Sequence, residues 1–179
     1  MKIHYTLASS PLGRLLVAAT DRGISALYLG EGDAQLEKSL QKEYPNAEIS
    51  RDSKKSKNLA VWVHEILAHL RGLEPHLDLP TDVQGTAFQR RVWEELRRIP
   101  SGDTRTYSQV ARAIGKPTAI RAVARACATN PVSVIVPCHR VVREDGNLAG
   151  YRWGLNRKRA LLEHESATAH AKDVRAAGV

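Results

Sequence analysis

A thiol and an imidazole stand side by side at Cys138 and His139, directly after the apolar run of residues 134–136. A free cysteine is a weak nucleophile until its thiolate is favoured, and an adjacent histidine can accept the proton directly or through a water. A single cysteine is more often a small buried hydrophobic residue than a reactive one. The surroundings of Cys138 must therefore decide between a structural and a catalytic interpretation.

Charge is unevenly distributed along the 179 residues. Residues 1–80 hold ten Lys or Arg and ten Asp or Glu, so their charges cancel. Residues 81–179 hold seventeen Lys or Arg and nine Asp or Glu and therefore carry the whole formal charge of +8. Clustered Lys and Arg commonly neutralise phosphates, so the second half is expected to bind a polyanion, although a solvated charged face is the simpler alternative. Two domains are expected, at residues 1–80 and 81–165, followed by a disordered tail at residues 166–179.

Cysteine is scarce, since Cys127 and Cys138 are the two in the chain. Two thiols are too few for a disulfide framework or a four-thiolate zinc site, so we expect no metal and a reducing, cytoplasmic environment. The first ten residues lack the apolar stretch of a signal peptide, and no segment approaches the roughly 18 apolar residues of a membrane span. A soluble protein without a membrane partner is expected.

The first half has the pattern of a small α/β domain. Residues 2–7, 14–20 and 23–29 are typical of three short strands joined by tight turns, which predicts an antiparallel meander. Helical periodicity extends over residues 33–43 and 57–71. A stretch with two prolines and a glycine, residues 73–85, is the expected linker.

The second half has the pattern of a helix-turn-helix. Residues 86–89 and 106–109 each have the form of a capping box, and a helix is expected after both. The second of these helices should end at Gly115, and another is predicted over residues 118–128 after a tight turn. Its packed side is expected to carry Ile120, Val123, Ala124 and Cys127.

The outward side of the helix at residues 118–128 carries arginines and small residues. It offers Thr118, Arg121, Ala122, Arg125 and Thr129, and it has no Asn or Gln that could pair with adenine. Such a surface is suited to DNA without sequence preference, because the alanines let the backbone approach closely while the arginines reach phosphates or a groove.

Three further features surround Cys138. A strand at residues 132–136 is expected to deliver it, and the glycine-flanked loop at residues 150–154 has two aromatic residues that could line a pocket. The last helix is predicted to begin near Leu155. On it, Lys158 and Glu165 lie two turns apart on one face and could point into one cleft, the alternative being a pair of exposed helix charges.

Taken together, the ordered motifs resemble those of the O6-alkylguanine-DNA alkyltransferases, the methylated-DNA–protein-cysteine methyltransferases. Residues 85–165 are most similar to the alkyltransferase portion of the bacterial adaptive-response protein. The resemblance implies a small RNase H-like α/β domain followed by a mainly helical domain with a helix-turn-helix or winged-helix-like fold. It is carried by Thr106, Tyr107, Arg121, Asn130, Pro131, residues 137–142, Gly150, Tyr151 and residues 161–165.

The resemblance also implies a reaction. Cys138 would attack the alkyl carbon on guanine O6, while His139 takes the thiol proton through a water and Glu165 orients the imidazole. Tyr107 would donate a proton to the leaving guanine, with Lys158 assisting at O6.

DNA handling is implied as well. The alkylated base would be turned out of a duplex, with Arg121 filling the gap and the recognition helix in the minor groove, in agreement with the small Ala119, Ala122 and Ala126. The resemblance makes Asn130 a hinge residue before the acceptor segment. Contacts to DNA are expected from Thr106, Thr118, Ala122 and Arg125, and contacts to the base from Val141, Tyr151, Arg152 and Trp153.

Single use follows from the chemistry. A thioether on Cys138 has no easy leaving route, and the sequence offers no second thiol at the site, so each molecule should act once without a cofactor. Some relatives carry a structural zinc in the first half, but no cysteine precedes Cys127 here. A stand-alone, monomeric repair enzyme is expected, with the choice among adducts, the repair of O4-alkylthymine and cooperative loading on DNA left open.

Two other functions fit parts of the sequence. A non-catalytic helix-turn-helix module could sense alkylated DNA, although it would not need Cys138. A cysteine hydrolase of the Cys-His-acid type would turn over small acyl substrates, although it would not need the basic second half.

Overall fold

The computed structural model describes residues 1–52 and 57–176. The described chain folds into two compact units. The first unit comprises residues 1–84 together with 131–135, and the second comprises residues 85–130 and those from 136 onward. The expected boundary at residue 80 therefore lies four residues too early, and the return of residues 131–135 to the first unit was not anticipated.

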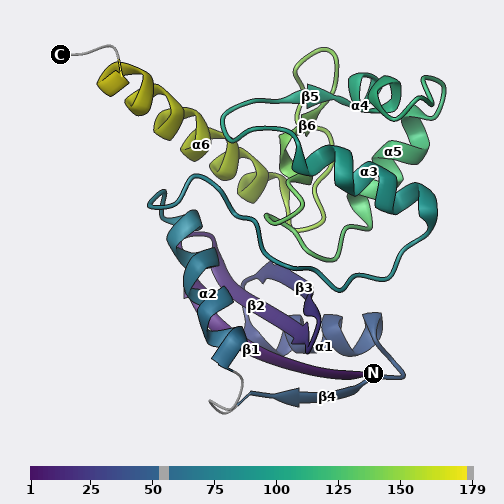
Figure 1. The fold of residues 1–179 in the computed structure, drawn as a ribbon, viewed down its shortest axis with the longest axis vertical. Coiled ribbons are helices and arrows are strands. Elements are labelled where there is room, and N and C mark those ends of the chain that lie inside the picture. Colours follow the sequence, from purple (N-terminus) through teal and green to yellow (C-terminus); the bar gives the residue numbers. More distant parts are fainter. Residues whose placement is uncertain (53–56, 177–179) are drawn as a thin grey trace. The chain divides into compact units, whose positions relative to one another are not determined.

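The first unit is built on a four-stranded sheet (Figure 1). The predicted meander is confirmed, because β1 (Lys2–Ser10), β2 (Gly13–Thr20) and β3 (Gly23–Gly30) pair in antiparallel succession. A fourth strand, β4 (Glu48–Arg51), pairs in parallel with β1 and completes the order β3-β2-β1-β4. Sequence analysis missed β4, since Ile49 is its one apolar residue.

Two helices cover this sheet. The predicted helix at residues 33–43 is α1 (Asp33–Glu43), which contacts β2 and β3, and the second is α2 (Lys57–Leu70), which contacts β1 and β2. Every residue of β3 is buried, so the sheet forms the centre of the first unit.

The edge of β3 anchors two segments that are distant in sequence. The amide of Ile24 donates to the carbonyl of Pro80 (2.9 Å), and the amide of Leu27 donates to that of Pro131 (2.8 Å). Gly23 permits the first contact, because a Cβ there would lie 2.7 Å from the Pro80 oxygen. These bonds assign part of the linker, and the start of the segment that leads to Cys138, to the first unit.

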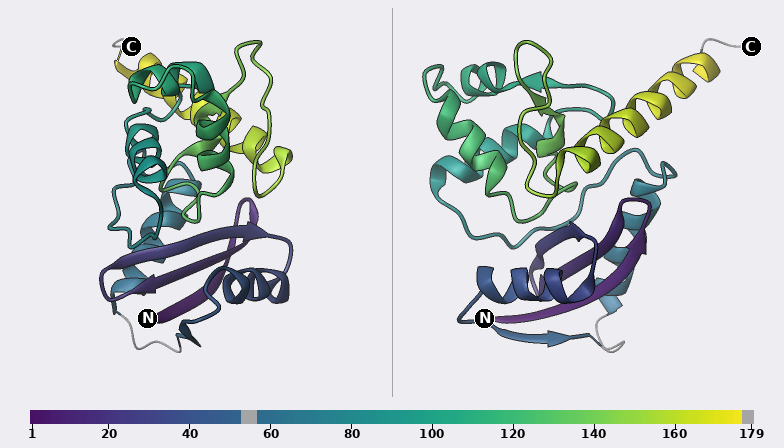
Figure 2. Two further views of the ribbon diagram at one scale, coloured as in Figure 1. Left: turned by 90° about the vertical axis from the view of Figure 1, so that its right-hand side faces the viewer. Right: turned by 180° about the vertical axis from the view of Figure 1, so that it is seen from behind.

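The second unit is mainly helical (Figure 2). Both predicted capping boxes are present, at Thr86 with Gln89 and at Thr106 with Gln109, and Gly115 (φ 69°) follows the shorter helix. The elements in chain order are α3 (Ala87–Arg97), β5 (Arg105–Thr106), α4 (Tyr107–Ala113), α5 (Ile120–Ala128), a 3₁₀ turn η1 (Cys138–Arg140), β6 (Val141–Val142) and α6 (Leu155–Ala176).

The helix-turn-helix is formed by α4 and α5, with two corrections to α5. It begins at Ile120, because Lys116 and Ala119 close a turn (2.9 Å) before it. Ile120 is 42% exposed, whereas Ala126 is 2% exposed. Ile120 was expected on the packed side and Ala126 on the DNA side, and both expectations are wrong because the packed stripe of α5 is rotated toward Ala126, whose carbonyl accepts from Trp93 Nε1 (2.9 Å).

The segment before Cys138 is buried but is not the expected regular strand. Val134 has φ 72°, and the amide of Ile135 donates to the carbonyl of Ser133 (2.9 Å), which makes a γ-turn. A second tight turn follows at Pro137, where the amide of Cys138 donates to the carbonyl of Val136 (2.8 Å). The apolar run therefore indicated burial correctly, but two three-residue turns replace the straight strand.

The tail expected at residues 166–179 is also corrected, since α6 continues through Ala176. Alanine, the best helix former, recurs in this stretch and supports its continuation. Residues 177–179 lie outside the described residues. None of the helices that the structure describes has the length and apolar character needed to cross a membrane.

Candidate active site

Cys138 lies in the wall of a pocket within the second unit. The pocket has a volume of about 390 Å³, and its walls come from α4, α5, η1 and the loop before α6. Cys138 itself is 4% exposed. The 3₁₀ turn η1 begins at this residue, which fixes the thiol at the end of the buried segment.

The side-chain amide of Asn130 lies beside the thiol. Asn130 Nδ2 lies 3.3 Å from Cys138 Sγ and 2.8 Å from the carbonyl of Val136. Burial raises the pKa of the Cys138 thiol, and the hydrogen bond from Asn130 and the charges of Lys158 and Arg152 only partly oppose this. The thiol is therefore protonated at neutral pH, and its reaction requires a base.

A base is adjacent, and its orientation is fixed. His139 Nε2 lies 2.8 Å from Glu165 Oε1, and His139 is fully buried. Burial lowers the pKa of His139, although the Glu165 carboxylate opposes the shift, so the ring is neutral at pH 7. Because a carboxylate can only accept, Nε2 carries the proton, and Nδ1, which has no partner among the described residues, keeps its lone pair.

Glu165 is shared between His139 and an arginine that sequence analysis did not single out. Arg140 donates from Nε (2.9 Å) and Nη2 (2.8 Å) to the two carboxylate oxygens, and from Nη1 (2.6 Å) to the carbonyl of Ile99. Burial alone would raise the pKa of Glu165, but the hydrogen bonds from His139 and Arg140 outweigh it and hold the pKa well below its usual range. The position of Arg140 directly after His139 was the available signal.

Lys158 is a fully buried cation on α6. Its Nζ donates to the carbonyls of Val141 (2.6 Å) and Gly150 (3.3 Å). Burial lowers the pKa of Lys158, while a negative charge on Cys138 would raise it. Lys158 and Glu165 are thus both interior groups of the second unit, and the alternative of two exposed helix charges is wrong.

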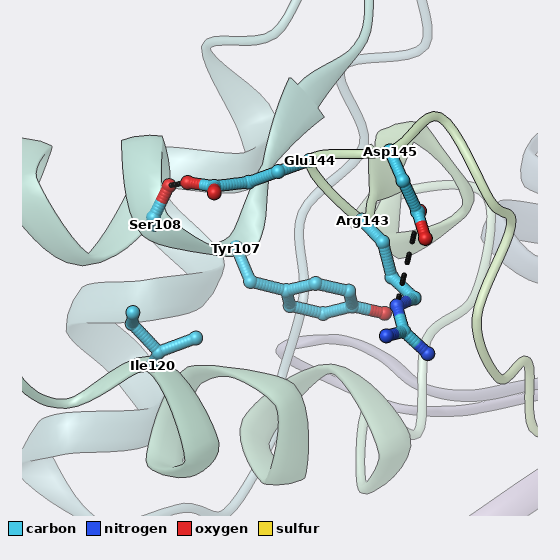
Figure 3. A pocket seen from close by; sticks show the side chains of 6 residues that line it. All are labelled: Tyr107, Ser108, Ile120, Arg143, Glu144 and Asp145. Carbon is cyan, nitrogen blue, oxygen red and sulfur yellow. Dashed lines mark hydrogen bonds and ion pairs between the residues drawn. The ribbon is translucent and has the colours of Figure 1, made fainter.

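Tyr107, the first residue of α4, lines the pocket of Cys138 and a second hollow of about 370 Å³. In Figure 3 the Tyr107 ring points across this second hollow, which Ser108 and Glu144 border as a hydrogen-bonded pair. Arg143 and Asp145 (3.9 Å) form its other border. Burial raises the pKa of Tyr107 to about 12, so its phenol is protonated at neutral pH and can donate a hydrogen bond.

The four expected pocket residues divide into two pairs. Tyr151 and Arg152 line the pocket, whereas Val141 and Trp153 are not among its lining residues in the described structure. Val141 instead supplies the carbonyl that accepts from Lys158, and the ring of Trp153 lies 4.8 Å from the guanidinium of Arg152. Trp153 therefore supports a pocket residue without forming the wall.

The residues expected to contact DNA lie at the surface of the second unit. Arg121, Ala122 and Arg125 are carried by α5 and are all exposed, and Thr118 is exposed in the turn before it. Thr106 is half-buried and caps α4 through its side chain.

Cys127 requires a correction. It is 7% exposed, as expected of a packed residue, but it also lines the pocket of Cys138. The periodicity of α5 placed Cys127 correctly on the inner side, and this inner side is the pocket wall. The expectation that no second thiol lies at the site is therefore wrong.

Two family descriptions match the chain. The ribonuclease-like domain of the 6-O-methylguanine DNA methyltransferases matches residues 3–83, and the DNA binding domain of the same proteins matches residues 87–167. The bifunctional transcriptional activator/DNA repair enzyme Ada of Escherichia coli is 49% identical over 93% of this chain and 46% of its own length. The chain thus spans about half the length of the Ada-type relatives that it matches.

Other relatives are covered almost completely. The methylated-DNA–protein-cysteine methyltransferase of Mycobacterium tuberculosis is 38% identical over 94% of this chain and 96% of its own length. A crystal structure of the O6-methylguanine methyltransferase of that organism has a TM-score of 0.77 at 36% identity, covering 93% of this chain and 94% of that one. A structure of the same protein in complex with DNA has a TM-score of 0.76 at 34% identity, covering 94% of both chains. On this similarity in sequence and fold, the chain belongs to the methylated-DNA–protein-cysteine methyltransferase family.

Proposed function

We propose that this protein repairs DNA by transferring the alkyl group of O6-alkylguanine in a duplex to Sγ of its own Cys138. One observation carries the proposal. A buried thiol in a pocket wall is followed in sequence by a neutral, buried histidine whose Nε2–H is held by Glu165 (2.8 Å) and whose Nδ1 is available to accept a proton.

The transfer is a displacement at the alkyl carbon. His139 Nδ1 takes the Cys138 proton through a water, the S–C bond forms, and the C–O6 bond breaks with its electron pair leaving on guanine. Glu165 stabilises the imidazolium that results. Asn130 Nδ2 and the buried charge of Lys158 favour the thiolate as it develops, because both act on Cys138 in the folded protein.

Tyr107 supplies the proton that the departing guanine needs. Its phenol stays protonated to about pH 12 and borders the same pocket as the thiol. A positioned donor of this kind is typically worth about 3 kcal/mol of transition-state stabilisation. Lys158 assists by its charge, with its ammonium anchored by the carbonyls of Val141 and Gly150.

The alkylated base must leave the duplex before Cys138 can reach it. Arg121, exposed on α5, fills the gap that the base leaves in the DNA stack, and Arg125 and Thr118 contact the DNA backbone. Turning out a base costs a few kcal/mol, and less for a poorly paired damaged base, which contributes to selectivity. The small, exposed Ala122 lets α5 approach the floor of the minor groove.

Each molecule acts once, because water does not cleave the S–C bond of the thioether and the alkyl group therefore stays on Cys138. The test is incubation of the protein with duplex DNA that carries O6-methylguanine labelled in the methyl group, with Cys138→Ser as the matched control. One label per protein, found on the peptide that contains residue 138, is the expected result.

Two outcomes would overturn the proposal. Label that stays in the DNA while the protein still binds it would indicate a sensor of alkylated DNA. Repeated turnover of acyl substrates without label on the protein would indicate a Cys-His hydrolase.

A further inference from the structure

Both cysteines of the sequence line one pocket. Cys127 faces it from α5 and Cys138 from η1, and each is more than nine-tenths buried. The transfer reaction uses Cys138 alone, so a second sulfur nucleophile stands unused beside the acceptor.

Cys127 is a weak nucleophile at neutral pH. Burial raises the pKa of its thiol far above neutral, and a negative charge on Cys138 raises it further. The Cys127 thiol therefore reacts only with a strong electrophile that is generated next to it. Transfer of an alkyl group with a second leaving group would generate such an electrophile on Cys138 itself.

We propose that Cys127 captures the second carbon of a 2-haloethyl group that Cys138 has accepted, which closes a two-carbon thioether bridge between the two residues. This inference rests on the proposed alkyl transfer to Cys138. What it adds is the product, a bridge between two residues of one pocket, which differs in kind from the methylated protein.

The reaction balances without an oxidant or a cofactor. Transfer leaves a 2-chloroethyl group on Cys138 Sγ, and a lone pair of this sulfur then displaces chloride to form a three-membered episulfonium ring. Cys127 Sγ attacks one ring carbon, so a new S–C bond forms while a C–S bond to Cys138 breaks with its electron pair returning to that sulfur. The proton of Cys127 passes to water, and the net loss is one chloride and one proton.

Two competitors could open the same ring. Water would leave a 2-hydroxyethyl group on Cys138, and a DNA base would join the protein to the DNA. Cys127 is favoured over both because it is held in the same pocket, and a well-oriented intramolecular nucleophile acts at a high effective concentration. The bridge would keep the second electrophilic carbon away from the DNA.

The test uses duplex DNA carrying freshly prepared O6-(2-chloroethyl)guanine, followed by acid quenching, trypsin digestion and mass spectrometry. Trypsin leaves both cysteines on one peptide, residues 126–140, because no Lys or Arg lies between Arg125 and Arg140. The bridged peptide is lighter by one water than the hydroxyethyl peptide, cannot react with iodoacetamide, and resists separation into fragments between residues 127 and 138.

In the wild-type protein we expect the bridged peptide to exceed the hydroxyethyl peptide by about tenfold or more. Cys127→Ser and Cys127→Ala should give the hydroxyethyl peptide or a DNA adduct instead. The inference would be overturned if the wild-type protein gave hydroxyethyl-Cys138 and the protein–DNA adduct in the same proportions as both Cys127 variants.

A parallel reaction with O6-methylguanine DNA separates this result from the proposed function. If the protein accepts methyl from the first DNA but forms no bridge after it accepts chloroethyl from the second, the bridge alone is refuted. Failure of the wild-type protein to accept methyl would refute the proposed function. The wild-type fragmentation pattern is decisive by itself if neither Cys127 variant folds.

Discussion

Asn130 holds the Cys138 thiol and the chain that leads to it with a single amide group: its Nδ2 lies 3.3 Å from Cys138 Sγ and 2.8 Å from the carbonyl of Val136. Between Asn130 and Val136 the chain makes an excursion into the first unit, residues 131–135. The amide therefore closes the base of this excursion and fixes the thiol relative to the end of α5.

We expect Asn130→Ala to lower the free energy of unfolding and to disfavour the thiolate form of Cys138. The Val136 carbonyl would lose its buried donor, which costs about 1–3 kcal/mol of unfolding free energy. The pKa of Cys138 would rise further, since the Asn130 hydrogen bond is the largest influence that lowers it. Urea unfolding measures the first effect, and the pH dependence of Cys138 modification by iodoacetamide measures the second. A variant whose modification profile matches the wild type would contradict the role of the amide.

Cys138→Ala should abolish methyl transfer and retain binding to duplex DNA. The expectation follows from the separation of the buried thiol on η1 from the exposed face of α5. Transfer is measured with the labelled duplex, and binding with an unmodified one at fixed salt, because phosphate contacts depend on salt. Loss of DNA binding in a folded variant would contradict the assignment of transfer to Cys138 and of DNA binding to the exposed face of α5.

Arg121→Ala should slow repair in a duplex by about 10- to 100-fold while leaving the reaction with the free modified base nearly unchanged. In the proposed mechanism its side chain serves only to hold the stack open, and each factor of ten corresponds to about 1.4 kcal/mol. Lys38→Ala, which removes a charge from α1 in the first unit, is the matched control. Equal losses in the duplex and free-base assays would show that Arg121 serves another purpose.

Local signals predicted most of the elements that position the site. Capping boxes at Thr86 and Thr106 depend on residues three positions apart, so they can be recognised without knowledge of the fold. The meander could be predicted for the same reason, because its turns join strands that are neighbours in sequence. The parallel pairing of β4 with β1 joins distant segments and left no comparable pattern.

The errors near the site arise from contacts that sequence spacing does not record. The apolar run before Cys138 indicated a strand, but the turns at Val134 and Pro137 bend it. Cys127 was assigned to packing because helical periodicity separates inside from outside and does not show whether the inside contains a pocket. Arg140 was missed as the second partner of Glu165 because its position beside His139 marks it as a neighbour of the site but does not show which residue, 25 positions along the chain, it pairs with.

Glu165→Gln should destabilise the protein in a pH-dependent manner. At pH 7 it leaves the buried Arg140 without its counter-charge, at a cost of about 3–5 kcal/mol. The folded-state pKa of Glu165 is depressed, so its contribution is present above the ordinary value of 4.5 and is lost as the pH falls below it. The difference between variant and wild type in urea unfolding should therefore stay nearly constant from pH 7 to about pH 5 and shrink as the pH falls below 4.5. A difference that stays constant as the pH falls below 4.5 would contradict the charge-based origin.

His139 produces a separate pH effect in the wild-type protein. Burial keeps its folded-state pKa below the ordinary 6.5, so the unfolded chain binds a proton that the folded protein does not as the pH falls through 6.5. Stability should decline there, and His139→Gln should remove that part of the decline. If the free energy of unfolding falls equally steeply for wild type and variant between pH 7 and the onset of carboxylate titration, His139 is not the source of the decline.

Benzyl adducts should react more slowly than methyl adducts because Arg152 narrows the pocket. Its guanidinium is held over the Trp153 ring (4.8 Å) and donates to the carbonyl of Asn130 (3.5 Å), so the side chain that lines the pocket is fixed from two sides. Trp153→Gly should free Arg152 to move away. We expect this variant to react about tenfold faster with O6-benzylguanine, equivalent to about 1.4 kcal/mol, with little change for the methyl adduct.

The double variant Arg152→Ala with Trp153→Gly distinguishes this route from direct obstruction by the indole. If Trp153 acts through Arg152, removing both side chains should accelerate the benzyl reaction no more than Arg152→Ala alone. Additive gains would mean that the Trp153 ring itself obstructs the adduct. A wild-type protein that reacts with O6-benzylguanine as fast as with the methyl adduct would remove the basis for a narrow pocket altogether.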